Sequence, residues 1–85
     1  MKEFHYTIRD ELGLHARPAS LLVKKAGELS SRIVVVKKGR KVDARRLFGV
    51  MSLGIRCGDA IKFKLEGPKE EEEAELLKRF CENTF

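Results

Sequence analysis

Two widely separated segments of the 85-residue sequence alternate apolar and polar side chains, and this pattern constrains the fold more than any other feature. Their apolar positions are Phe4, Tyr6 and Ile8 in the first segment and Ile61, Phe63 and Leu65 in the second. A period of two predicts strands with one buried face each. A sheet of such strands needs a cover on one side only, so we expect helices on a single face of one sheet.

The sequence between these strands predicts a helix followed by a β-hairpin. Pro18 suits the first turn of a helix, where its missing N–H costs nothing, and Gly27 is placed to end that helix. Residues 33–36 and 42–44 flank the pair 38–39, Lys-Gly, which supplies the positive φ of a hairpin turn. The buried stripe of the helix is predicted to be Ala19, Leu22, Val23 and Ala26.

Two further helices are predicted on either side of the second alternating strand. Residues 47–54 are too few for a long helix and predict one of about two turns. Residues 69–81 predict the last helix, because acids gather at its start and bases near its end, as the helix dipole favours. Its apolar face is predicted to be Ala74, Leu77, Phe80 and Cys81. The order strand, helix, strand, strand, helix, strand, helix indicates an α+β fold.

Length and composition are those of one folded domain. With 42% apolar and 36% charged residues the chain can bury one modest core, so we expect a single domain over residues 1–85. No apolar run is long enough to cross a bilayer and no secretory signal is visible, so we expect a cytoplasmic protein without membrane insertion. Cys57 and Cys81 form no CxxC pair, and neither they nor His5 and His15 have metal-ligand spacing, so we expect reduced thiols and no metal.

The net charge of +5 raises the alternative of nucleic-acid binding. The basic residues are spread out, however, and residues 70–73 form an acidic block. The most basic turn, residues 37–41, contains no aromatic side chain. A solvated surface therefore explains the charge better, and we expect no nucleic-acid partner. If the protein did bind nucleic acid, the binding would weaken steeply with added salt.

His15 stands just before the predicted first turn of the helix that contains Pro18. The first backbone N–H groups of a helix, here from Ala16 onward, have no intrahelical partner and make an anion site with the positive dipole end. Arg17 adds a permanent charge whose donors match phosphoryl oxygens. A ring nitrogen, a guanidinium and free amides are sufficient to accept and pass on a phosphoryl group.

The sequence contains no Gly-rich nucleotide cradle and no carboxylate cluster for a metal, so we expect the phosphate donor to arrive on another protein. His15 and its neighbours would then be half of an active site. The alternative is a histidine that caps a helix or lies on the surface. Spacing alone favours that structural role and does not decide between the two.

Two stretches of the sequence resemble a known family. Residues 13–19, GLHARPA, are similar to the phosphorylation-site signature of the histidine-containing phosphocarrier protein family, HPr, of the bacterial sugar phosphotransferase system. Residues 47–55, LFGVMSLGI, resemble the second characteristic stretch of the family, and the similarity extends over essentially the whole chain. The resemblance implies an open-faced β-sandwich, with a four-stranded antiparallel sheet and three helices packed on one face.

The resemblance also implies a function. His15 would accept a phosphoryl group on Nδ1 from phosphoenolpyruvate-charged enzyme I and pass it to enzyme IIA domains of sugar permeases. Arg17 would assist the transfer, together with the backbone N–H of Ala16. The protein would be a carrier and not an enzyme. It would act as a monomer and would need no cofactor beyond the transient phosphate. The implied docking surface beside the histidine consists of Ser20, Lys24, Leu47, Phe48 and Met51.

The docking assignment has an alternative, because an apolar cluster on a short helix is more often core than interface. We expect Val50 and Leu53 to keep that core role.

One position departs from the family: many relatives from Gram-positive bacteria carry at position 46 a serine that an ATP-dependent kinase phosphorylates in carbon catabolite repression. Arg46 cannot accept that phosphate, so we expect no regulation at this position. Arg45 and Arg46 are expected to make the docking face more basic with Lys24, and so to speed encounter with acidic partners.

A second functional hypothesis is an HPr-like regulatory interaction protein that keeps the fold and no longer relays phosphate. The presence of His15 and Arg17 is evidence against it.

Overall fold

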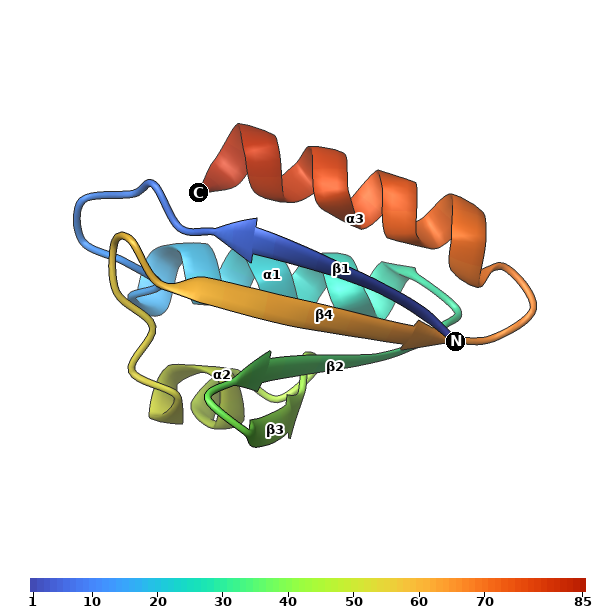
Figure 1. The fold of residues 1–85 in the computed structure, drawn as a ribbon, viewed down its shortest axis with the longest axis horizontal. Coiled ribbons are helices and arrows are strands. Elements are labelled where there is room, and N and C mark those ends of the chain that lie inside the picture. Colours follow the sequence, from blue (N-terminus) through green and yellow to red (C-terminus); the bar gives the residue numbers. More distant parts are fainter.

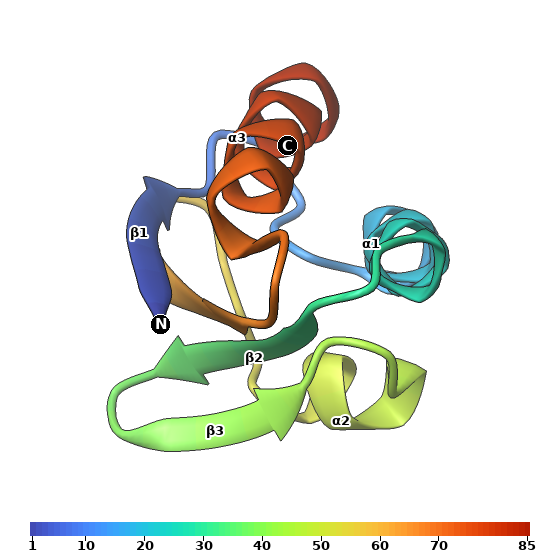
Figure 2. The same cartoon turned by 90° about the vertical axis from the view of Figure 1, so that its right-hand side faces the viewer.

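The computed structural model describes residues 1–85 and contains one sheet and three helices (Figure 1). The strands are β1 (Lys2–Thr7), β2 (Arg32–Lys37), β3 (Arg40–Asp43) and β4 (Ala60–Glu66). The helices are α1 (Ala16–Glu28), α2 (Leu47–Ser52) and α3 (Glu70–Thr84). All neighbouring strands are antiparallel, in the order β1-β4-β2-β3. Figure 2 shows the three helices on one side of the sheet, which confirms the predicted α+β architecture.

The strand register brings the alternating apolar residues together on the covered face. Phe63 of β4 lies opposite Phe4 of β1 and opposite Val35 of β2. The rings of Phe4 and Phe63 stack with their centroids 5.1 Å apart. Leu22 of α1 and Leu77 of α3 are fully buried against this face, so the predicted strand and helix periodicities are confirmed.

The end of α1 differs from the sequence-based prediction. Gly27 does not end the helix, which continues through Glu28 and is capped by Leu29 in an extended conformation. Gly27 has no positive φ. A left-handed glycine is unnecessary because the guanidinium of Arg45 binds the carbonyl oxygens of Ala26 and Leu29 that a glycine cap would otherwise help to satisfy.

The predicted hairpin between β2 and β3 is confirmed. Lys38 and Gly39 have φ angles of 48° and 82°, as a tight turn between twisted strands requires. Lys37, just before the turn, is not a free surface cation, because its Nζ lies 2.8 Å from Asp59 Oδ2 and donates to the carbonyl oxygen of Gly54 at 2.7 Å. Ala44 was predicted as part of the second hairpin segment, but it lies just beyond β3, in the turn into α2, and is buried.

Glu73 in α3 is buried, although it belongs to the acidic block of residues 70–73. Its carboxylate accepts hydrogen bonds from the backbone N–H and hydroxyl groups of Ser30 and Ser31. Burial by itself raises the pKa of Glu73, but the hydrogen bonds from Ser31 and Ser30 outweigh it and lower the pKa to about 2. This carboxylate joins the turn between α1 and β2 to the start of α3.

The remaining features concern the cysteines and the helix lengths. Cys57 is exposed and Cys81 is buried, and neither forms a disulfide. Burial raises the pKa of the Cys81 thiol to about 12. None of the three helices has the length and apolar character that crossing a membrane requires.

Candidate functional site

Hydrogen bonds donated by backbone N–H groups hold the loop before His15 in place. Asp10 accepts hydrogen bonds from Leu12 N through its carboxylate and from Gly13 N through its carbonyl oxygen, both at 2.9 Å. Leu14 is buried, and its N–H donates to the carbonyl oxygen of Ile55 at 3.0 Å. Gly13 has a φ of 70°, and a Cβ there would lie 2.5 Å from that same oxygen, so only glycine fits this approach.

His15 is the N-cap residue of α1. Its extended backbone turns the chain into the helix, and its carbonyl oxygen accepts the first helical hydrogen bond, from Ala19 N at 2.9 Å. The imidazole forms no capping hydrogen bond, so the purely structural role as a side-chain cap is not what the structure shows. The N–H groups of Ala16 and Arg17 donate to no protein acceptor, and Pro18 has none to donate. Two free amides therefore open toward solvent at the positive end of α1.

His15 and Arg17 line the same open depression, which has a volume of about 460 Å³. The imidazole is partly exposed, and the Arg17 side chain is exposed. The other residues around this depression are Asp10, Leu12, Pro18, Leu21, Asn83 and Thr84. No group of three or more histidine, cysteine or acidic side chains is arranged to hold a metal ion.

The last turn of α3 forms one wall of this depression, which sequence reasoning missed. Asn83 and Thr84 line the depression together with His15, and Arg9 holds the end of α3 against the end of β1. Arg9 donates from Nη2 to the carbonyl oxygen of Glu82 at 2.9 Å and from its backbone N–H to that of Phe85 at 2.8 Å. No local sequence pattern signals this contact, because its partners lie at opposite ends of the chain.

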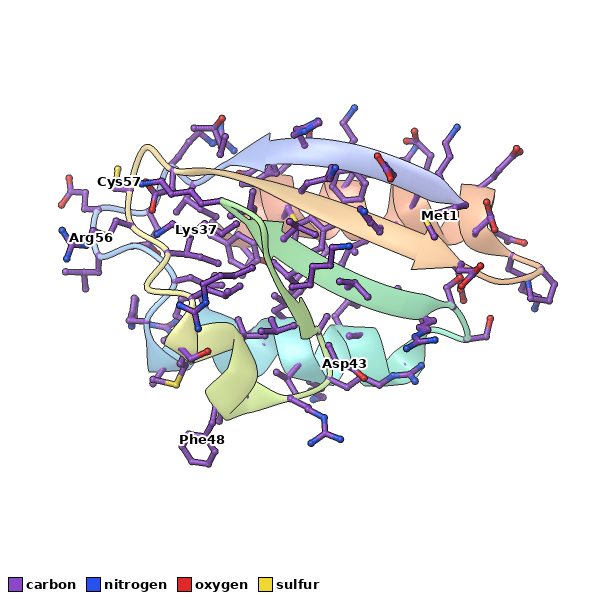
Figure 3. All side chains as sticks on the ribbon, turned by 60° about the horizontal axis from the view of Figure 1, so that its bottom comes forward. Met1, Lys37, Asp43, Phe48, Arg56 and Cys57 are labelled. Atoms are coloured by element: carbon purple, nitrogen blue, oxygen red, sulfur yellow. The ribbon has the colours of Figure 1, made fainter.

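The residues of the implied docking surface lie on α1 and α2, which pack against each other. Ser20 and Lys24 are exposed on α1. Phe48 of α2 is 84% exposed and projects away from the ribbon, as Figure 3 shows. Met51 is 38% exposed, whereas Leu47 is half-buried against the core.

The same short helix also contributes to the core, as predicted. Val50 is fully buried, and Leu53 just beyond the helix is 5% exposed. The helix therefore buries one side and leaves Phe48 without intramolecular cover. Large apolar side chains that are left in solvent as neighbours, as Phe48 and Met51 are on α2, are typical of a surface that binds another protein.

The two arginines before α2 behave differently. Arg46 is exposed and forms no ion pair, which is compatible with the predicted basic docking face. Arg45 is exposed too, but its guanidinium is engaged, because it donates to the carbonyl oxygens of Ala26, Leu29 and Ser31. Its charge is used at the C-terminal end of α1, where the helix dipole attracts a cation.

The sequence matches the family model for the PTS HPr component phosphorylation site over residues 2–83. The chain belongs to the HPr family, whose members are phosphocarriers and not catalysts. The chain is 39% identical to the phosphocarrier protein HPr of Mycoplasma genitalium, with 96% of this chain and 94% of that protein covered. It is also 40% identical to the HPr-like protein Crh of Halalkalibacterium halodurans, over 96% of this chain and 98% of that protein.

A solved structure shows the same fold. The crystal structure of HPr-C-His from Thermoanaerobacter tengcongensis superposes with a TM-score of 0.92 at 44% sequence identity. The match covers 100% of this chain and 96% of that one. The predicted HPr-like open-faced sandwich is thereby confirmed.

Proposed function

We propose that this protein accepts a phosphoryl group on His15 from phosphorylated enzyme I and passes it to enzyme IIA domains of sugar permeases. The observation that supports the proposal most directly is the position of His15 at the start of α1. There the amides of Ala16 and Arg17 are unpartnered, and Arg17 lines the same open depression as the partly exposed His15. Membership of the HPr family supports the same function.

In the proposed transfer, Nδ1 of His15 attacks the phosphorus atom held by the donor protein, and the bond from phosphorus to the donor breaks as the new P–N bond forms. The three phosphoryl oxygens keep their negative charge throughout, so the acceptor must align and neutralise them. The Arg17 guanidinium would neutralise the charge on these oxygens, and the Ala16 N–H would donate a hydrogen bond that aligns them. Transfer to the next protein is the reverse step toward a different acceptor.

The proposed docking surface for both partners consists of Ser20, Lys24, Leu47, Phe48 and Met51. The exposed ring of Phe48 would fill an apolar pocket of the partner, and the cations around it would contact acidic side chains. The proposed ligand of the site is transient phosphate, with no metal or organic cofactor. The proposed partners are proteins and not nucleic acid; the pairing of Lys37 with Asp59, which takes one cation out of the most basic turn, supports this.

The experiment that tests the relay is incubation with enzyme I and phosphoenolpyruvate carrying labelled phosphate. We expect one label per chain, retained in His5→Gln and lost in His15→Gln. His5 is a matched control because it is exposed on a strand, away from the start of α1. An unlabelled wild-type protein, or a label that survives in His15→Gln, would contradict the proposal.

A second candidate is a regulatory interaction protein with the HPr fold and no relay. The 40% identity to the HPr-like protein Crh favours it, whereas the intact pair of His15 and Arg17 favours the relay. The labelling experiment separates the two functions. Arg46 offers no hydroxyl, so we expect no phosphorylation at this position by an ATP-dependent kinase.

We propose that the protein acts as a monomer of one domain. An HPr from Thermoanaerobacter tengcongensis, 43% identical to this chain, has been crystallised as a dimer, and the mass in solution distinguishes the two states. Light scattering coupled to gel filtration should give the mass of one chain, 9.7 kDa. A stable mass twice as large would contradict the monomer.

A further inference from the structure

Arg45 links two segments that are distant in sequence and adjacent in space. Its Nη2 donates to the carbonyl oxygen of Leu29 at 2.8 Å and to that of Ser31 at 3.4 Å. Its Nε donates to the carbonyl oxygen of Ala26 at 3.3 Å. One guanidinium therefore binds the last turn of α1 and the connection to β2.

The backbone of Arg45 belongs to the turn that leads directly into α2. Asp43 orders this turn by accepting from Arg45 N through its carboxylate at 2.9 Å and from Arg46 N through its carbonyl oxygen at 3.0 Å. Leu47, the first residue of α2, follows two positions later. The side chain and backbone of one residue thus connect the end of α1 with the start of α2.

Arg45 is too far from the phosphoryl site to take part in the chemistry. It binds α1 at Ala26, eleven residues after His15, which at 1.5 Å per residue is roughly 16 Å along the helix axis. Any effect of Arg45 on phosphoryl transfer must therefore act through the positions of other residues.

The proposed docking surface is divided between the two helices that Arg45 connects. Ser20 and Lys24 lie on α1, whereas Phe48 and Met51 lie on α2 (Figure 3 labels Phe48). A partner that contacts both helices at once requires a fixed angle and separation between them. The six-residue α2 has no interior long enough to set its own orientation, so its neighbours must do so.

We propose that Arg45 is a positioning residue that holds α2 against α1 in the arrangement that partners recognise. This inference rests on the docking surface of the proposed function. Arginine suits the task because its planar fork reaches several carbonyl oxygens at once, whereas a lysine offers a single ammonium group. Loss of the fork lets α2 shift without removing any residue of the docking surface itself.

The test compares Arg45→Met, Arg45→Lys and Arg46→Met. Arg45→Met keeps an unbranched apolar side chain and removes the donors, and Arg46→Met removes the same charge one residue away, where no hydrogen bond is lost. For transfer from phosphorylated enzyme I, we expect Arg45→Met to raise KM about fivefold with kcat unchanged. That rise should persist at high salt and be partly rescued in Arg45→Lys, whereas the effect of Arg46→Met should disappear as salt screens it.

Two further measurements separate a change of orientation from unfolding or from damage to His15. Phosphorylation of His15 by phosphoramidate, a small donor that needs no docking surface, should proceed at the wild-type rate in Arg45→Met. Residual dipolar couplings of α1 and α2 should report a changed angle between the helices below the melting temperature. An unchanged angle, or a KM effect that salt removes as in Arg46→Met, would overturn the inference. An absence of any transfer from enzyme I to the wild-type protein would contradict the proposed function instead, and the couplings would still decide the role of Arg45.

Discussion

The backbone N–H of Leu14 donates a 3.0 Å hydrogen bond to the carbonyl oxygen of Ile55, which fixes the residue before His15 to the loop between α2 and β4. The side chain of Leu14 is buried at the same place. His15 is therefore held from one side by this loop and from the other by the helix that it caps. The backbone on both sides of His15 is thus constrained, which fixes the point from which its side chain extends.

Gly13→Ala should destabilise the protein and disturb His15. The new Cβ would lie 2.5 Å from the carbonyl oxygen of Ile55 in a residue whose φ is 70°, so both a collision and an unfavourable backbone conformation arise. We expect a loss of about 3 kcal/mol in the free energy of unfolding, measured by urea denaturation. Gly54→Ala is the control, because its φ is 59° but nothing lies near its Cβ, and it should cost only about 1 kcal/mol. Equal losses in the two variants would rule out the steric explanation.

Glu73 should make stability depend on pH in the acid range. Its folded pKa of about 2 lies below the ordinary value of 4.5, so its contribution is complete above pH 4.5 and is lost as the pH falls from 4.5 toward 2. Glu73→Gln should cost about 2 kcal/mol at pH 7, because the amide leaves the donors of Ser30 and Ser31 poorly satisfied.

The pH dependence distinguishes this carboxylate from the exposed acids of α3. Thermal unfolding of wild type and Glu73→Gln should converge as the pH is lowered through this window. Glu75→Gln, an exposed position on the same helix, is the control and should follow the wild-type curve. A constant difference between wild type and Glu73→Gln at all pH values would show that ionisation of Glu73 does not matter.

Replacing Phe48 by alanine should weaken partner binding and leave stability nearly unchanged, whereas replacing Phe63 by alanine should lower stability. Phe48 is 84% exposed, so Phe48→Ala should change the free energy of unfolding by no more than about 0.5 kcal/mol. If Phe48 anchors the partner, KM for transfer from enzyme I should rise roughly thirtyfold. Phe63 is fully buried, and Phe63→Ala should cost about 3–5 kcal/mol of stability. Normal transfer kinetics for Phe48→Ala would remove this residue from the docking surface.

Lys24 and Arg46 should speed the encounter with acidic partners. Both are exposed, and neither forms an ion pair. Replacing both by methionine should lower kcat/KM for transfer by about tenfold at low ionic strength, with the difference shrinking as salt is added. Lys38, exposed in the turn between β2 and β3, provides the control, because Lys38→Met removes a charge that lies on neither helix of the proposed docking surface. The same salt dependence in Lys38→Met would mean that net charge alone is responsible.

The fold was largely predictable because short stretches of sequence indicate its helices, strands and turns. The alternation around Phe63, the helical stripe that includes Leu22, and the Lys38-Gly39 turn each depend on neighbours within a few residues. The end of α1 was not predictable. Gly27 is a frequent helix stop, but the carbonyl oxygens there are satisfied by Arg45 from another part of the chain. A signal for Glu73 did exist, because it lies four residues before Leu77 on the buried face of α3.

The sequence by itself determined the strand and helix periodicities and the placement of His15 and Arg17 at a helix start, because these properties arise from residues that are neighbours in the chain. Only the tertiary structure decided that Asn83 and Thr84 line the same depression as the histidine, that Arg45 binds the end of α1, and that Glu73 is buried. These contacts join segments from opposite parts of the chain. Their geometry follows from how the helices pack on the sheet, which no local pattern encodes.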